Sequence, residues 1–215
     1  MKKLRIFIFL MVFLLFVFNK NEIMAHQPNY LGNKTEVIVV DPEISRAFYG
    51  ELNGSKVTFN VYSEKEFNLY ANLLSPDIKN TKIDFKLEVF DKKDIIIGNI
   101  SGGEWKKYWE EFARDSYLKG GEFEKILPAG KYRLVLSNPD NNGKYSVAIG
   151  KKESFPVGVF LTLFPELIKI KTQIFEKPWY DAFNNIFGFS ILILIIILTV
   201  IIKLVFFKKR IKIGK

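Results

Sequence analysis

The chain has 215 residues, 48% of them hydrophobic, a formal net charge of +9 and no cysteine. This length suits one domain with a core of its own, and the lack of cysteine excludes disulfides and a lipid-modified lipoprotein start. Three cations near the amino terminus and six near the carboxy terminus account for the whole charge, so the middle of the chain is neutral. The charge therefore indicates membrane topology and argues against nucleic-acid binding.

Residues 1–25 have the layout of a secretory signal peptide. Lys2, Lys3 and Arg5 precede an apolar run from Ile6 to Phe18, and Ala25 is small enough for the position before a cleavage site. The alternative is an uncleaved membrane anchor. The apolar run is short for a hydrocarbon core about 30 Å thick, so we expect cleavage.

Cleavage after Ala25 leaves His26, the only histidine, as the new amino-terminal residue. Its amino group and its imidazole can then chelate one metal ion, and a tetragonal set of nitrogen and oxygen ligands suits Cu(II). Pro28 stops the metal from recruiting a further peptide nitrogen, because proline has no amide proton to lose. The alternative is a frayed terminus without a ligand. Copper binding at His26 is thus one of two hypotheses for this residue.

Between residues 35 and 150, short runs rich in β-branched and aromatic residues alternate with turn formers. In several runs apolar and polar side chains alternate, as where Phe85, Leu87 and Val89 flank Lys86 and Glu88. A period of two is typical of antiparallel strands with one face in water. The sequence predicts a mainly β fold, with an antiparallel β-sandwich or jelly roll over residues 26–150 and strands near 35–40, 46–52, 56–63, 67–74, 82–90, 95–100, 131–137 and 144–150.

One segment, residues 103–125, departs from this pattern. Trp105, Tyr108, Trp109 and Phe112 stand at i, i+3, i+4 and i+7, with charged residues between them. This spacing predicts a short helix with one aromatic stripe. We expect the stripe to pack on the sheet. The alternative is a platform on which Trp105 and Trp109 stack against a sugar or a peptide.

After the predicted sandwich, residues 151–182 form a connector that is partly helical. Pro165 suits the first turn of a helix that runs to about Phe175. Residues 183–207 then form an apolar run long enough to cross a bilayer as one transmembrane helix.

The residues around this run predict its orientation. Trp179 and Tyr180 lie at the depth of an interfacial aromatic belt, and Lys203 lies near the far end, where its side chain can reach the headgroups. The tail 208–215 is basic and has no acid, and it begins with Lys208, Lys209 and Arg210. By the positive-inside rule the tail is cytoplasmic and the rest is extracytoplasmic. The sequence predicts a single-pass type I protein of the cell membrane.

The closing stretch of the predicted sandwich, LPAGKYRLVLSNPDNNGKYSVAIG at 127–150, resembles the last hairpin of bacterial pre-peptidase C-terminal-type β-sandwiches. More broadly, AHQP, DPEISRAFYGEL and the segment 103–125 resemble a set of uncharacterised exported proteins with one carboxy-terminal span. These resemblances imply a fold and a topology, and they bring no activity.

No catalytic arrangement is recognisable in the sequence. There is no cysteine nucleophile, no G-x-S-x-G, no H-E-x-x-H and no phosphate loop. We therefore expect no enzyme. The favoured function is that of a membrane-anchored, non-enzymatic extracytoplasmic domain that binds or organises another component of unknown identity, and a membrane or cell-surface protein is one candidate partner. The alternative is copper binding or handling through His26, and no other cofactor is expected.

Overall fold

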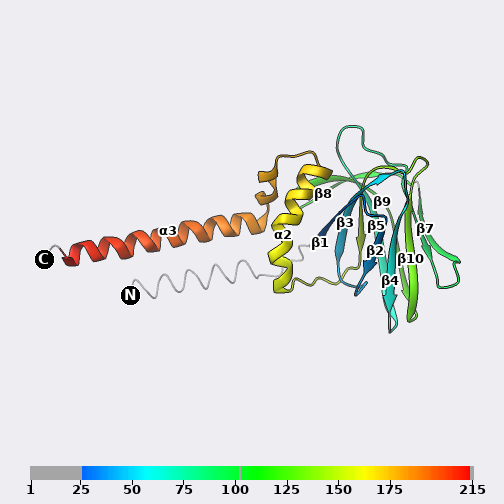
Figure 1. The fold of residues 1–215 in the computed structure, drawn as a ribbon, viewed down its shortest axis with the longest axis horizontal. Coiled ribbons are helices and arrows are strands. Elements are labelled where there is room, and N and C mark those ends of the chain that lie inside the picture. The colour runs from blue at the N-terminus through cyan, green and yellow to red at the C-terminus, as the bar shows by residue number, and fades with distance from the viewer. Residues whose placement is uncertain (1–25, 102, 214–215) are drawn as a thin grey trace. The chain divides into compact units, whose positions relative to one another are not determined.

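The computed structural model describes residues 26–101 and 103–213. The predicted signal peptide, residues 1–25, lies outside the described residues. The chain divides into two compact units, one ending at Ala182 and the other containing Phe183 onward. In the first unit, two layers of strands form a sandwich (Figure 1), which confirms the predicted mainly β fold.

One layer is a six-stranded sheet with the order β1-β3-β11-β5-β9-β8. Its strands are β1 Gln27–Gly32, β3 Arg46–Asn53, β11 Asn142–Ile149, β5 Phe67–Pro76, β9 Asp115–Leu127 and β8 Lys106–Glu110. The other layer is a five-stranded sheet with the order β2-β4-β10-β6-β7. Its strands are β2 Glu36–Val39, β4 Val57–Ser63, β10 Gly130–Ser137, β6 Lys86–Phe90 and β7 Ile96–Ser101.

The sheets are mixed, so the prediction of a purely antiparallel sandwich was wrong at one side. β1 pairs with β3 in parallel, and β2 pairs with β4 in parallel. The reason is the path of the chain, because the first four strands alternate between the two sheets and each short connection reverses the direction. Strands two apart in sequence therefore lie side by side and point the same way.

The helix predicted over residues 103–125 is also wrong, because the segment is the β8–β9 hairpin. Glu110 caps its turn, since its carboxylate oxygens accept hydrogen bonds from the main-chain N–H groups of Phe112 at 3.0 Å and Ala113 at 2.6 Å. Arg114 then takes a φ of 56°, a left-handed conformation that a helix cannot contain. The chain thus reverses in the middle of the aromatic segment.

The main core lies between the sheets and follows from the period-two pattern of the strands. Phe85, Leu87 and Val89 all point inward and are fully buried. Inward residues of the other strands complete one continuous cluster that includes Phe59, Leu69, Leu134, Leu136, Tyr145 and Val147. Each large apolar side chain buried in this way stabilises the fold by about 1.5–3 kcal/mol.

A second apolar cluster lies on the outer face of the six-stranded sheet. It is covered by the end of a helical segment that comprises α2, Val157–Lys169, and the π-helical turn η1, Ile170–Ile174. Ile170, Ile174 and Phe175 pack there against side chains of β3, β5, β9 and β11. The connector is thus partly helical as predicted, but α2 begins at Val157, and Pro165 lies inside it.

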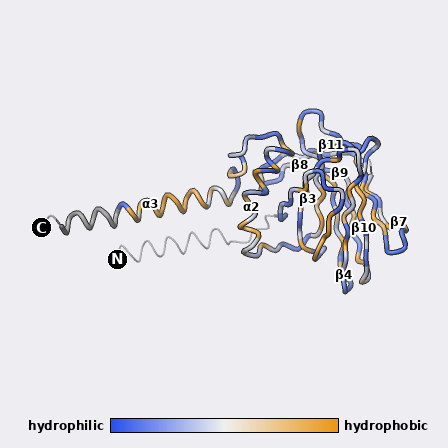
Figure 2. The backbone as a smooth tube through the Cα atoms, viewed as in Figure 1, coloured by the Kyte–Doolittle hydropathy of each residue, from blue (hydrophilic) through white to orange (hydrophobic). Residues whose placement is uncertain are grey.

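The second unit is dominated by α3, Ile186–Ile213. The Asn185 side chain begins this helix by accepting hydrogen bonds from the N–H groups of Phe187 and Gly188, both at 3.0 Å. Figure 2 shows α3 strongly hydrophobic over its first half. Within the residues that the structure describes, no helix is long and apolar enough for a membrane span, so the transmembrane helix predicted at 183–207 is not supported there.

Candidate functional site

A cavity of about 200 Å³ lies on the outer face of the six-stranded sheet. We call it the tyrosine cavity. Its walls carry imidazole, phenol, amide, hydroxyl, carboxyl and amino groups, and its lining residues are His26, Ala47, Tyr49, Tyr70, Asn72, Leu74, Tyr108, Glu110, Tyr117, Lys119, Ser146 and Ala148.

The strand period explains how this set assembles. Side chains two residues apart on a strand point to the same face, and each strand delivers such a set to the cavity. β5 supplies Tyr70, Asn72 and Leu74, and β8 supplies Tyr108 and Glu110. β3, β11 and β9 add pairs at the same spacing, namely Ala47 with Tyr49, Ser146 with Ala148, and Tyr117 with Lys119.

His26 lies at the edge of the cavity, immediately before β1. Its Nδ1 atom is 2.5 Å from the Oγ atom of the buried Ser45. Burial lowers the pKa of His26 to about 4, so the imidazole is neutral at pH 7. A neutral ring with one nitrogen bonded to Ser45 has its other nitrogen available to a ligand.

The same geometry bears on the copper hypothesis. A chelate through the amino group and the imidazole uses Nδ1, the ring nitrogen nearer the main chain, and this atom is already engaged by Ser45. Among residues 26–101 and 103–213, no group of three or more His, Asp or Glu side chains is placed to hold a metal ion. Copper at His26 stays a prediction, and it would require the bond to Ser45 to break.

Glu110 is nearly buried at the floor of the cavity, where burial raises the pKa of its carboxyl group. The two N–H groups from the hairpin turn act in the opposite direction and stabilise the charged form. Both carboxylate oxygens are therefore occupied by main-chain donors. Glu110 holds the turn in place and adds a negative field to the cavity.

The tyrosines form two pairs of contacts. The hydroxyl groups of Tyr49 and Tyr117 lie 2.9 Å apart, and burial raises the pKa of both phenols. The Tyr70 hydroxyl donates to Glu122 at 3.1 Å, and the Lys151 ammonium group lies 4.4 Å from the centre of the Tyr70 ring. The phenols thus remain protonated at neutral pH, and they offer hydroxyl groups and aromatic faces.

A buried ionic cluster closes the turn beside Glu110. The Lys171 ammonium group, from η1, lies 2.8 Å from Asp115 Oδ1 and 2.6 Å from the carbonyl oxygen of Ala113. Lys177 also reaches Asp115 Oδ1 at 2.8 Å, and Asp181 lies 3.2 Å from Lys171. The side chains of Lys171 and Asp115 are both fully buried. These pairs attach the connector to the β8–β9 hairpin.

The structure brings some of the predicted residues together and leaves others apart. His26 and Phe112 line one small recess that also contains Glu110, and Tyr108 lines the cavity next to it. Trp105 instead packs at the edge of the main core, and Trp109 is 52% exposed. Neither indole lines the cavity.

The predicted membrane-anchor residues fall outside the cavity as well. Trp179 and Tyr180 are exposed and stack edge-to-face at 6.0 Å. Lys203 is exposed on α3. The side chains of Lys208, Lys209 and Arg210 lie outside the described part of the structure.

Sequence reasoning missed most of the cavity wall, including Tyr49, Tyr70, Tyr117, Glu110 and Lys119. One signal was available. In "RAFYGEL" and "FNLYANLL" the positions opposite the core face carry tyrosine and asparagine, whereas a face in water usually carries charged residues. Aromatic residues on an outer face indicate that something covers it.

Comparison with known proteins gave solved structures only, since no family model and no curated protein sequence matches. A periplasmic inhibitor of g-type lysozyme from Aeromonas hydrophila is 13% identical, with 56% of this chain and 98% of that chain covered and a TM-score of 0.37. A pre-peptidase C-terminal domain of a Bacillus anthracis collagenase is 13% identical, with 59% and 95% covered and a TM-score of 0.32. A surface-associated copper-binding protein of Methylomicrobium album BG8 is 7% identical, with 57% and 100% covered and a TM-score of 0.30. At these values the likenesses carry no argument about function.

Proposed function

We propose that this protein is a non-enzymatic binding domain and that the tyrosine cavity is its ligand site. The observation that carries the proposal is the convergence of five strands and His26 on one polar cavity of about 200 Å³. Ligand sites are typically concave, with a few polar groups placed among aromatic walls. The tyrosine cavity meets that description.

Binding without catalysis is supported by how the ionisable groups are used. A general acid or base needs a proton position within reach of the substrate and a pKa near the working pH. Both oxygens of Glu110 are occupied by the hairpin turn, and the pKa of His26 is lowered to about 4. Neither group is suited to proton transfer at neutral pH.

The ligand class follows from the size and chemistry of the walls. Drug-sized ligands occupy pockets of roughly 300–1,000 Å³, so about 200 Å³ suits one ring with its substituents. Tyr108, 40% exposed, offers an aromatic ring and a hydroxyl group, and Lys119 offers an ammonium group. A single hydroxyl-rich ring, such as one sugar residue, matches this combination.

The site is proposed to face the extracytoplasmic side, tethered to the cell membrane by α3. The sequence supports this through the apolar run and the basic tail after it. An epitope tag after Lys215 should then be stained only in permeabilised cells, and staining of intact cells would refute this orientation.

The binding proposal can be tested by saturation-transfer NMR of the full chain, solubilised in detergent, with a panel of monosaccharides. We expect signals from at least one sugar, reduced in Tyr108→Ala and Lys119→Ala. Tyr62→Ala is the matched control, because Tyr62 is an exposed tyrosine on the other sheet. Absence of every signal, or equal signals in the cavity variants and the wild type, would refute the ligand class.

A further inference from the structure

β2 is an edge strand of the five-stranded sheet, and no strand among residues 26–101 and 103–213 pairs with its outer edge. It pairs in parallel with β4, with Glu36 opposite Thr58 and Ile38 opposite Asn60. The N–H of Thr58 donates to the carbonyl oxygen of Thr35 at 2.8 Å. In a parallel ladder this bond turns the main-chain groups of the odd-numbered residues toward β4. The N–H and C=O groups of Glu36 and Ile38 therefore point to the free edge.

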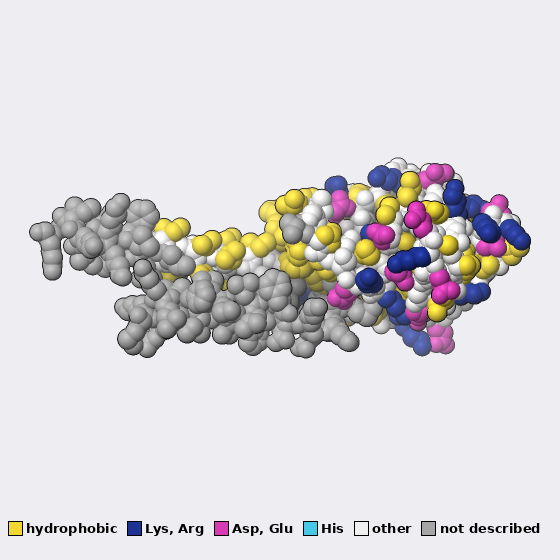
Figure 3. All heavy atoms as spheres, turned by 90° about the horizontal axis from the view of Figure 1, so that it is seen from below, with side chains coloured by type: hydrophobic (Ala, Val, Ile, Leu, Met, Phe, Trp, Pro, Cys, Tyr) yellow, Lys and Arg dark blue, Asp and Glu magenta, His cyan; other side chains and the backbone are white. Residues whose placement is uncertain are grey.

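The side chains at this edge are apolar. Ile38 is 78% exposed, Val40 is 62% exposed and Tyr62, beside them on β4, is 53% exposed. Protein edges are usually protected by lysine, proline or inward-pointing charges. In β2 only Glu36 is charged, and Asp41 and Pro42 follow the strand, so the apolar stretch between these residues is Val37 to Val40. Figure 3 shows charges of both signs interspersed among apolar side chains on the face of the first unit that it draws.

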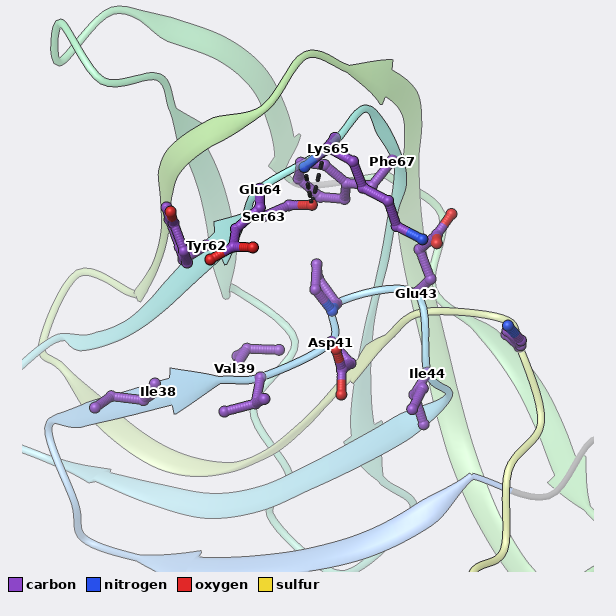
Figure 4. Close-up of a pocket in the computed structure, with 13 residues that line it drawn as sticks. Ile38, Val39, Asp41, Glu43, Ile44, Tyr62, Ser63, Glu64, Lys65 and Phe67 are labelled. Atoms are coloured by element: carbon purple, nitrogen blue, oxygen red, sulfur yellow. Dashed lines mark hydrogen bonds between the residues drawn. The ribbon is translucent and has the colours of Figure 1, made fainter.

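A groove of about 720 Å³ begins where β2 ends. It lies between the β2–β3 connection and the β4–β5 turn, and Figure 4 shows Ile38 and Asp41 on one side and Tyr62 and Glu64 across from them. Three acids line it, Asp41, Glu43 and Glu64, together with Lys65 and Lys152. The groove is therefore apolar at the β2 end and has one net negative charge.

We propose that this edge joins two copies of the chain, with β2 of one copy antiparallel to β2 of the other and Ile38 at the two-fold axis. This arrangement does not depend on the ligand of the tyrosine cavity. The two Ile38 residues then exchange both main-chain hydrogen bonds, and the two five-stranded sheets become one continuous sheet. An isologous contact of this kind closes as a dimer and leaves no further edge at β2.

The charges favour a second copy as the occupant. With Ile38 opposite Ile38, Glu36 of each copy lies opposite Val40 of the other, so the two Glu36 carboxylates do not face each other. Lys34, exposed in the turn before β2, then comes to the side of the other copy's groove that carries Asp41 and Glu43. The contact thus covers the apolar edge, satisfies the free main-chain groups of Ile38 and brings opposite charges together, while the Val40 carbonyl oxygen keeps its hydrogen bond from Arg46.

The absence of cysteine from the chain allows a direct test. Residues directly opposite in a hydrogen-bonded antiparallel pair have Cα atoms about 5.5 Å apart, within the ~4.4–6.8 Å range of disulfides. Ile38→Cys in the full chain, in membranes or detergent, should form a disulfide-linked homodimer under mild oxidation. Ile96→Cys, on the opposite edge strand β7 and 51% exposed, is the control and should remain monomeric.

A second variant distinguishes a stable dimer from a disulfide that forms only when two chains meet by chance. Ile38→Lys places like charges across the axis and should weaken dimerisation roughly tenfold or more, measured as the mass of the detergent-solubilised full chain against concentration. Circular dichroism should stay unchanged, because Ile38 is largely exposed. A monomeric wild type, equal cross-linking at Ile96→Cys, or cross-linking of Ile38→Cys only to a different protein would each overturn the proposal.

Discussion

Lys171 offers the strongest test of how the connector is held on the sandwich. Its side chain is fully buried, and so is that of its partner Asp115. The change Lys171→Met keeps the length of the side chain and removes the charge. Asp115 then remains buried with Lys177 as its only cation, 2.8 Å from Oδ1 and 36% exposed, while Asp115 Oδ2 is already without a hydrogen-bond partner among the described residues.

Removing one partner of a buried ion pair costs about 3–5 kcal/mol, because the other charge stays buried without compensation. Lys177 compensates in part, so we expect the lower end, about 3 kcal/mol. For a domain of this size each kcal/mol lowers the melting temperature by about 2–4 °C, which gives a fall of about 6–12 °C. Urea denaturation of the detergent-solubilised full chain, followed by circular dichroism, measures the free energy directly.

Lys177→Met is the matched control, because it removes the same chemistry from the same carboxylate at a more exposed position. Its expected cost is about 1 kcal/mol or less. The double variant Lys171→Met with Asp115→Leu should be more stable than Lys171→Met alone, since it also removes the buried Asp115 carboxylate that has lost its main ion-pair partner. Equal costs for the two lysine variants, or a double variant that is less stable than Lys171→Met, would refute the reasoning.

Two further predictions concern the edge of the cavity and the end of β11. Burial lowers the pKa of His26 in the folded protein from 6.5 to about 4. As the pH drops from about 6.5 toward 4, the unfolded chain therefore binds a proton at His26 before the folded protein does. The free energy of unfolding should fall over this range by at most about 3 kcal/mol. His26→Gln should remove this loss in melts across that range, and an unchanged pH profile would contradict it. Gly150 has a φ of +79°, and a Cβ there would lie 2.6 Å from the Glu43 carbonyl oxygen, whereas Gly54, with a φ of +77°, has open space around it. In urea denaturation Gly150→Ala should cost clearly more than Gly54→Ala, which carries only the backbone strain of about 1 kcal/mol; equal costs would count against a steric role for Gly150.

The strands that the sequence predicts are those in which apolar and polar residues alternate because one face of the strand is in the core and the other is in solvent. In β6 the inward Leu87 and Val89 are fully buried while Lys86 and Glu88 remain partly exposed. β1 has no such pattern, because "QPNYLG" contains a proline and a glycine and few core residues. It is a strand because it lies at a sheet edge, where Pro28 can leave its missing N–H on the unpaired side.

The prediction of a helix in the aromatic segment is wrong because the helical spacing of its aromatic residues arises without a helix. Trp105, Trp109 and Phe112 match a helical stripe, and the stretch 106–110, KKYWE, shows no alternation of apolar and polar residues that would indicate a strand. The deciding features are local and leave no regular pattern in the sequence. They are the Glu110 carboxylate that caps the turn and the left-handed backbone at Arg114.

The tyrosine cavity could not be predicted from any single segment of the sequence, because its walls come from strands as far apart in the chain as β3 and β11. Each strand contributes only two or three outward residues, such as Tyr70, Asn72 and Leu74 of β5, and such a short set does not by itself indicate a cavity. In an open sandwich these outward tyrosines would leave apolar rings in water. Ile170 and Ile174 cover part of that face, and the cavity is the part that they leave open. Tyr49, Tyr70 and Tyr117 are buried, and Tyr108, 40% exposed, lies where the face stays open. The proposed ligand site is therefore set by how far the connector extends over this face, which no single strand shows in its sequence.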